Sequence, residues 1–147
     1  MSKTSLSAGE IVRELLISND VLKSKVTKIF PVITDKAKLP YISYRKIGFS
    51  QDLTKSGRGA DTITMQVSVY AESYKQSLEL SELVRESLDY KQFVHYCGDL
   101  GVSFSSDFGT DCDPSEHLIM RSCNLTDCNE TWMDDAFIQN MVFTIKI

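Results

Sequence analysis

The chain has 147 residues, of which 42% are hydrophobic and 24% charged, with only 7 glycines and 3 prolines. This length and composition fit one globular domain, residues 1–147, and exclude disorder along the whole chain. The formal net charge is −4 and no lysine- or arginine-rich block is present, which argues against a dedicated DNA-binding protein.

The N-terminal segment carries Glu10, Arg13 and Glu14 among its apolar residues. It therefore lacks the apolar run of a signal peptide, and no stretch reaches the length of a membrane span. We expect a soluble protein made in the cytoplasm, where cysteines stay reduced. The residues expected to remain thiols are Cys97, Cys112, Cys123 and Cys128.

The first element is a helix with two local start signals. Ser7 and Glu10 have the Ser-x-x-Glu spacing of a capping box, and Leu6 and Ile11 have the spacing of a hydrophobic staple. An apolar stripe follows these residues and predicts a helix from about residue 8 to residue 18.

Turns and extended segments come next. Asn19 or Asp20 is expected to cap one further short turn. Residues 26–32 predict a short strand, which Pro31 restricts to an edge or an end of a sheet. Residues 41–49 predict a second strand because they are rich in aromatic and β-branched residues.

A polar stretch separates this strand from the clearest alternating segment of the chain. Residues 50–61 are polar and contain two glycines, which predicts an extended hairpin loop. Residues 62–70 alternate apolar and polar side chains. This alternation predicts a strand with one buried face and one face that is wet or at an interface.

The main helix is predicted at residues 74–89, where Ser73 and Gln76 form a second capping box. Residues 91–116 carry weak signals, with one short strand expected near residues 102–106.

Two strands, residues 118–131 and 136–147, end the chain and turn near residues 133–135. The order helix, strands, helix, strands predicts an α+β fold. We expect a mostly antiparallel β-sheet with two main helices packed on one face.

No catalytic motif is found, and we expect no enzyme and no cofactor. The sequence has no nucleophile elbow, no P-loop and no His-Glu-x-x-His. The Gly57-Arg58-Gly59 loop is followed by a predicted strand, whereas a phosphate cradle needs a helix N-terminus there.

The cysteines and histidines of the sequence do not favour a metal site. The ligand types of a zinc site occur in one segment: His95, Cys97, Cys112 and His117. They lack the tight Cys-x2–4-Cys knuckle of structural zinc sites. Cys123 and Cys128 are five residues apart on a predicted strand, so without a bulge their side chains lie on opposite faces.

A group of four carboxylates and the single residue Trp132 each allow an ordinary and a functional interpretation. Carboxylates that could hold calcium occur at Asp107, Asp111, Asp113 and Glu116. Their spacing lacks the EF-hand glycine and final glutamate, which favours a solvated acidic loop. Trp132 lies near the last turn, where it either caps the core or sits at a protein interface. The core position is favoured, and Trp132 is kept as a candidate interface residue.

Several segments together resemble a phage family. They are the arm at Phe30–Val32, the LPYISY stretch at Leu39–Tyr44, the strand-to-helix join at Val67–Tyr74 and the alternating end at Met141–Ile147. This arrangement is similar to the tail-completion (tail-terminator, head-tail joining) proteins of long-tailed bacteriophages and prophages. The likeness covers nearly the whole chain, except that residues 93–117 resemble no part of the family.

The resemblance implies a structural protein of the virion, assembled in the bacterial cytoplasm. Such subunits close into a ring, typically a hexamer, at the head-proximal end of the tail tube. The ring stops polymerisation of the major tail tube protein and presents a surface to the head connector. DNA passes through its lumen without specific binding, and no membrane is involved.

The resemblance also suggests where contacts lie. We expect the loop at residues 51–61 to reach toward the tube or the lumen, and its candidate interface residues are Gln51, Lys55, Arg58 and Asp61. Two alternatives stay open: another head-tail connector or stopper subunit, and a cytoplasmic α+β ligand-binding module.

Overall fold

The computed structural model describes residues 3–32, 37–54, 57–104 and 111–147. Its helices are η1 (Ser5–Ser7), α1 (Ala8–Ile17), α2 (Asp20–Lys25), α3 (Tyr74–Leu88), η2 (Gly98–Leu100) and η3 (Pro114–Glu116). Its strands are β1 (Ile29–Pro31), β2 (Tyr41–Thr54), β3 (Gly57–Ala71), β4 (Lys91–Cys97), β5 (Val102–Ser103), β6 (His117–Met133) and β7 (Ala136–Lys146). None of the helices in these ranges is long and apolar enough to cross a membrane.

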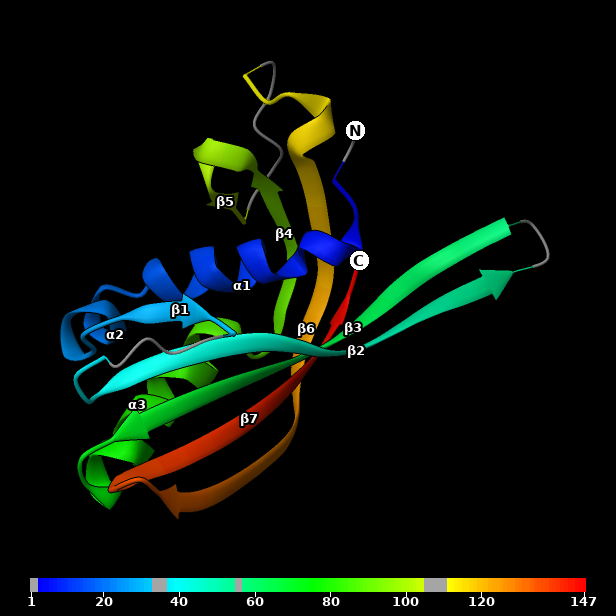
Figure 1. Cartoon of the computed structure of the whole chain (residues 1–147). Helices are drawn as coiled ribbons and strands as arrows, with labels where there is room; N and C mark the ends of the chain where they lie inside the picture. Colours follow the sequence, from blue (N-terminus) through cyan, green and yellow to red (C-terminus); the bar gives the residue numbers. More distant parts are fainter. Residues whose placement is uncertain (1–2, 33–36, 55–56, 105–110) are drawn as a thin grey trace.

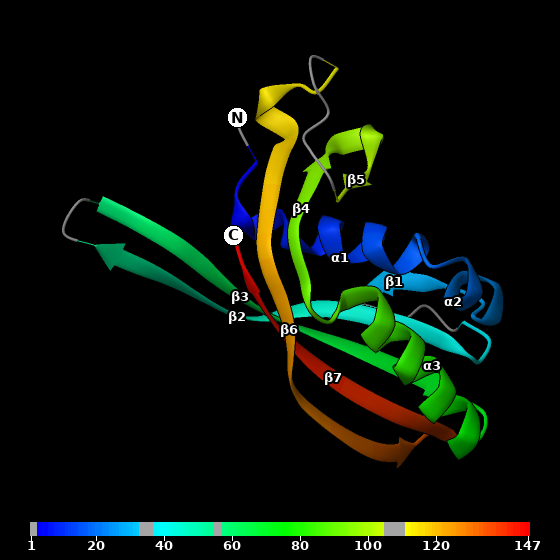
Figure 2. The same ribbon diagram turned by 180° about the vertical axis from the view of Figure 1, so that it is seen from behind.

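One sheet organises the molecule, with the strand order β1-β2-β3-β7-β6-β4-β5. The β1–β2 pair is parallel and the other pairs are antiparallel. Helices α1 and α3 lie on the same face, and the sheet curls so that α1 contacts β1, β2 and β5 (Figures 1 and 2). The predicted α+β fold with a mostly antiparallel sheet is confirmed.

The core lies between this face and the two helices. Its largest fully buried side chains include Ile11 and Leu16 of α1, Leu80 and Leu88 of α3, and Phe143 of β7. The alternation predicted along β3 is confirmed as well. The core-facing residues are Ile63, Met65, Val67 and Val69, each at most 1% exposed.

The first helix forms as predicted, but its predicted start signals are wrong. The Ser7 side chain makes no capping hydrogen bond, because the preceding turn of η1 leaves Ser7 in a turn conformation. Glu10 instead accepts hydrogen bonds from Lys3 and Tyr96. Leu6 is 61% exposed and forms no staple.

Two other capping predictions are confirmed. The Asn19 side chain accepts a hydrogen bond of 3.2 Å from the Leu22 N–H and begins α2. Ser73 accepts one of 3.2 Å from the Gln76 N–H and begins α3. The Gln76 side chain in turn accepts one of 2.9 Å from the Glu72 N–H.

The loop predicted at residues 50–61 is wrong, because β2 and β3 remain paired as far as Thr54 and Gly57. Bulges between Lys46 and Gly48 and between Gln51 and Leu53 interrupt the ladder. Both faces of a projecting two-stranded ribbon are solvated, so polar side chains fit either face and the strands continue through this polar sequence.

The weakly patterned segment holds β4, a strand that the sequence did not reveal. Positive φ angles of 60° at Tyr90 and 51° at Phe93 distort the start of this strand. Its apolar and polar residues therefore do not alternate regularly along the sequence. The short strand expected near residues 102–106 is β5, whose last described partner is Ser103; residues 105 and 106 lie outside the described residues.

The strands β6 and β7 and their turn are confirmed. Met133 pairs with Ala136, so the connection has two residues. Asp134 and Asp135 have φ angles of 53° and 61°, which is the conformation of a type I′ turn.

Candidate functional site

A two-stranded ribbon projects from one end of the sheet (Figure 1). The last β7 residue paired with β3 is Lys146, opposite Thr62. Beyond this point the described parts of β2 and β3 pair with one another, with Leu53 opposite Arg58. We call residues 51–54 and 57–60 the arm. Because an isolated hairpin is at best marginally stable in water, the arm is a candidate contact surface.

The candidate loop residues occupy different places on this ribbon. Gln51 is exposed on β2, and Arg58 lies on β3 within the arm. Lys55 lies outside the described residues. Large apolar side chains accompany them on β2: Ile47 is 45% exposed, Phe49 50% and Leu53 79%. The arm therefore combines polar residues with apolar surface that has no cover within the described chain.

Asp61 fastens the root of the arm. Its side chain is buried, and Oδ2 accepts a hydrogen bond from Ser5 Oγ. Its backbone N–H and C=O pair with Ile147 at 2.9 and 3.0 Å. The Asp61 carboxylate is therefore turned inward, unlike the exposed Gln51.

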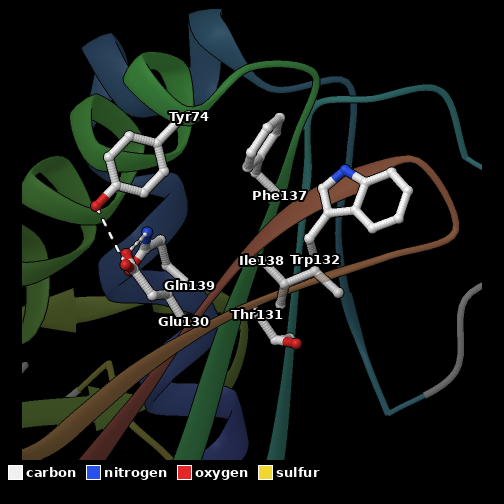
Figure 3. A pocket seen from close by; sticks show the side chains of 7 residues that line it. All are labelled: Tyr74, Glu130, Thr131, Trp132, Phe137, Ile138 and Gln139. Atoms are coloured by element: carbon white, nitrogen blue, oxygen red, sulfur yellow. Dashed lines mark hydrogen bonds between the residues drawn. The ribbon is translucent and has the colours of Figure 1, made fainter.

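A second surface lies at the opposite end of the long strands, beside the β6–β7 turn. It is a shallow pocket of about 290 Å³, which we call the aromatic pocket (Figure 3). Its lining residues are Tyr74, Glu130, Thr131, Trp132, Phe137, Ile138 and Gln139. Trp132 is 58% exposed, so the favoured interpretation of Trp132 as a core cap is wrong. Trp132 of β6 pairs in register with Phe137 of β7.

Glu130 is held in this pocket by two neutral donors. The Tyr74 hydroxyl donates to Oε1 at 3.2 Å, and the Gln139 amide donates to Oε2 at 2.9 Å. Gln139 is buried and its amide also contacts Ser77 Oγ at 3.3 Å. The hydrogen bond to the carboxylate raises the pKa of Tyr74. No cation in the described part of the chain pairs with Glu130.

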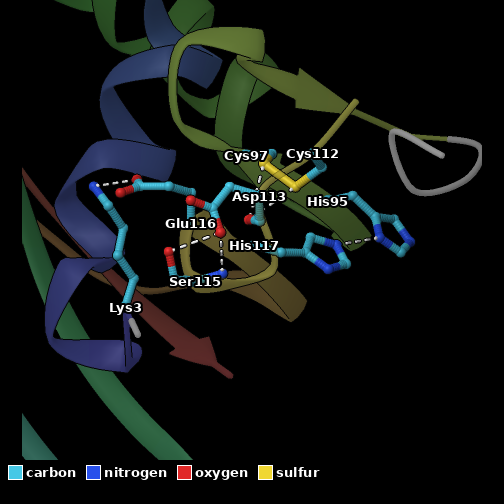
Figure 4. The surroundings of a disulfide bond; sticks show 8 residues. All are labelled: Lys3, His95, Cys97, Cys112, Asp113, Ser115, Glu116 and His117. Carbon is cyan, nitrogen blue, oxygen red and sulfur yellow. Dashed lines mark hydrogen bonds and ion pairs between the residues drawn. A yellow bond between two sulfur atoms is a disulfide. The ribbon is translucent and has the colours of Figure 1, made fainter. Parts of the chain in front are cut away.

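The zinc-type residues do come together, at the junction of β4 and β6 (Figure 4). Cys97 pairs in register with His117, and His95 Nδ1 lies 3.2 Å from His117 Nε2. Cys97 and Cys112, however, form a disulfide with a Cα–Cα distance of 6.0 Å. The prediction of four thiols is therefore wrong, because the fold places two cysteines 15 residues apart within bonding distance.

The disulfide removes two of the four candidate zinc ligands at this junction. Both sulfur atoms are bonded to one another, so neither is a free thiolate ligand. Among the described residues, no group of three potential ligands is arranged to hold a metal ion.

The acidic segment does not form a shared site in its described part. Asp113 caps η3 by accepting hydrogen bonds from the Ser115 N–H and hydroxyl at 3.0 and 2.9 Å, and these lower its pKa. Glu116 pairs with Lys3 at 3.2 Å. Asp111 is exposed, and Asp107 lies outside the described residues.

Cys123 and Cys128 were expected on opposite faces only if the strand had no bulge, and β6 does contain one. The bulge between Leu125 and Asp127 adds one residue to β6, so the side chains of Cys123 and Cys128 lie on the same face of the sheet. Cys123 therefore pairs with Ile145 and Cys128 with Met141, both on the helix-bearing face. Cys123 is buried, which raises the pKa of its thiol to about 12, whereas Cys128 is exposed.

The chain is a small α+β protein with a projecting ribbon at one end of its sheet and an exposed aromatic pocket at the other. The sequence profile of the family "Tail completion protein gp17" matches residues 10–116, and the chain belongs to this family. It is therefore a virion-associated structural protein of the phage tail, which associates with other phage structural proteins. The match includes residues 93–116, so the expectation that this segment falls outside the family is wrong.

A solved structure shows the same fold. A chain in "Virion of native gene transfer agent (GTA) particle" superposes with a TM-score of 0.64 at 13% sequence identity. The similarity covers 92% of this chain and 90% of that chain. No curated protein sequence matches the chain.

Proposed function

We propose that this protein forms a ring, of six subunits, at the head-proximal end of the tail tube. The ring stops polymerisation of the major tail tube protein and presents the surface that the head connector binds. Membership of the tail-completion family supports this role. The net charge of −4, without a basic block, suits a lumen through which DNA passes without specific binding.

The observation that carries the proposal is the arm. A ribbon with a leucine 79% exposed gains stability when another protein covers it. Burying one large apolar side chain contributes about 1.5–3 kcal/mol. A neighbouring subunit or the end of the tail tube would supply such a cover once the particle assembles.

The first experiment is a stop codon at Glu10 in the phage or prophage, followed by electron microscopy of the lysate. A tail terminator predicts overlong tails beside full, tailless heads. Tails of normal length that fail to join heads would favour the connector or stopper alternative. Ordinary infectious particles would contradict both roles.

The second experiment removes the arm and keeps its root. Residues 51–60 are replaced by a short Gly-Ser linker while Asp61 is retained, because Asp61 bonds Ser5 and Ile147. We expect a folded protein by circular dichroism that no longer supports head-tail joining. Full infectivity of this variant would contradict a role for the arm.

A further inference from the structure

Four side chains of the aromatic pocket share one face of the sheet. Glu130 pairs in register with Gln139, and Trp132 pairs with Phe137 two residues further along each strand. Side chains two residues apart on a strand point to the same face, roughly 7 Å from one another. This is the helix-bearing face, because Tyr74, the first residue of α3, bonds to Glu130. The pocket therefore lies where α3 begins, and Trp132 remains exposed beside it (Figure 3).

The carboxylate of Glu130 is oriented but not neutralised. The Tyr74 hydroxyl donates to Oε1 at 3.2 Å, and the amide of the buried Gln139 donates to Oε2 at 2.9 Å. Both donors are uncharged, and each carboxylate oxygen has two acceptor sites. In the described part of the chain, no basic side chain forms an ion pair with Glu130. Each oxygen therefore keeps an acceptor site for a second donor, which suits a bidentate cation.

The strands around the pocket add further negative charge. Residues 122–145, which include the parts of β6 and β7 that line the pocket, contain four acidic residues and no basic residue. Besides Glu130 these are Asp127, Asp134 and Asp135, and all three are exposed. This end of the sheet therefore attracts a positively charged group and repels an anion.

The size and walls of the pocket suit one side chain of a partner protein. Its volume of about 290 Å³ lies below the roughly 300–1,000 Å³ of small-molecule sites. The rings of Tyr74 and Phe137 meet edge to face with centroids 6.1 Å apart, and the indole of Trp132 completes the wall. An arginine has an apolar stem that packs on such rings. Its planar guanidinium pairs with a carboxylate and stacks on an aromatic face.

We propose that the aromatic pocket binds an arginine side chain of another protein of the virion. The guanidinium pairs with Glu130, and its stem lies against Trp132 and Phe137. The partner is a protein because the chain associates with other phage structural proteins. The inference requires neither a ring nor a position along the tail, so it goes beyond the proposed function and names a site and the residue type that it takes.

Fluorescence of the purified chain tests the site directly, because Trp132 is the only tryptophan. The probe is N-acetyl-arginine amide at constant ionic strength, and the neutral isostere N-acetyl-citrulline amide is its matched control. We expect a saturable change in emission in the millimolar range with the arginine probe alone. No saturation by about 100 mM would overturn the proposal, because a ligand of this size in a fitting site binds more tightly than that.

The variant Glu130→Gln keeps the shape of the side chain and removes its charge. It should weaken binding of the arginine probe at least about tenfold, and circular dichroism checks that the variant is folded. Glu82→Gln, at an exposed position of α3, is the matched control and should bind as wild type. Equal binding by wild type and Glu130→Gln would overturn the assignment. Tighter binding of N-acetyl-lysine amide would overturn the choice of arginine.

Complementation of the Glu10 stop mutant tests the pocket in the particle. Glu130→Gln and Trp132→Ala should each lower the infectious titre at least about tenfold, because residues of this kind dominate the stability of interfaces. Glu82→Gln should complement fully. If the stop mutant has the tail defect but both pocket variants complement fully, docking on a virion protein is overturned while the ring function stands. If the stop mutant has no defect, the ring function fails, and binding of the arginine probe still decides the site.

Discussion

Ser5 Oγ lies 2.5 Å from Asp61 Oδ2 and joins the N-terminal turn to the root of the arm. The two residues are 56 positions apart in the chain. Asp61 is 7% exposed, and no described residue donates a hydrogen bond to its other oxygen, Oδ1. The Ser5 hydroxyl therefore ties the N-terminal turn to the root of the arm, where the backbone of Asp61 also pairs with Ile147.

The first prediction concerns this hydrogen bond. Ser5→Ala should lower the free energy of unfolding by about 1–3 kcal/mol, because it leaves a buried acceptor without a donor. Adding Asp61→Asn to Ser5→Ala should recover part of the loss, since the buried group is then neutral. Denaturant titration measures both effects, and a loss below about 0.5 kcal/mol would contradict the assignment.

The second prediction concerns pH. The hydrogen bond from Lys3 lowers the pKa of Glu10 below its ordinary 4.5, so its contribution to stability is lost as pH falls through that lowered pKa. Burial, with the hydrogen bond to Glu10, raises the pKa of Tyr96 from 10.0 to about 12. That contribution is complete below pH 10 and is lost as pH rises toward 12.

Melting temperatures measured across pH test both limbs. Glu10→Gln should flatten the acid limb, and Tyr96→Phe the alkaline limb. Glu82→Gln, at an exposed position of α3, should leave the profile as in wild type. Unchanged acid sensitivity in Glu10→Gln would show that the Lys3–Glu10 pair does not matter for stability.

The third prediction concerns the disulfide. Cys97 and Cys112 are separated by 15 residues, and closing a loop of that length contributes about 3 kcal/mol in the chain-entropy model. Cys97→Ser with Cys112→Ser should lower stability by a similar amount, and reductant should have no further effect on this variant. Thiol titration of the unfolded, unreduced wild type should find Cys123 and Cys128, and four thiols would contradict the bond.

The fourth prediction concerns the last turn. Asp135 has a φ angle of 61°, in the left-handed region that glycine adopts without a steric cost. Asp135→Ala should destabilise the protein by about 1 kcal/mol, whereas Asp135→Gly should be neutral or stabilising. Thermal unfolding compares the two variants. Equal losses in both would show that the charge at this position matters more than its backbone conformation.

Local signals predicted several elements correctly. Ser73 with Gln76 marked the start of α3, and the alternation of residues 62–70 gave the buried face of β3, because these patterns act within a few residues of chain. The arm was mistaken for a loop because polar, glycine-containing sequence is typical of loops. Such residues form strands here because β2 and β3 pair with one another and solvent covers both faces of the ribbon.

The amino-acid sequence by itself determined the fold class and the two main helices, since apolar periodicity depends on near neighbours, and the resemblance of its segments pointed to the family. Tertiary structure decided which distant residues meet: Cys97 with Cys112, Ser5 with Asp61 and Tyr74 with Glu130. It also decided that Trp132 lies on the surface. These relations depend on how the sheet curls and where its bulges fall, and no local pattern in the sequence specifies either.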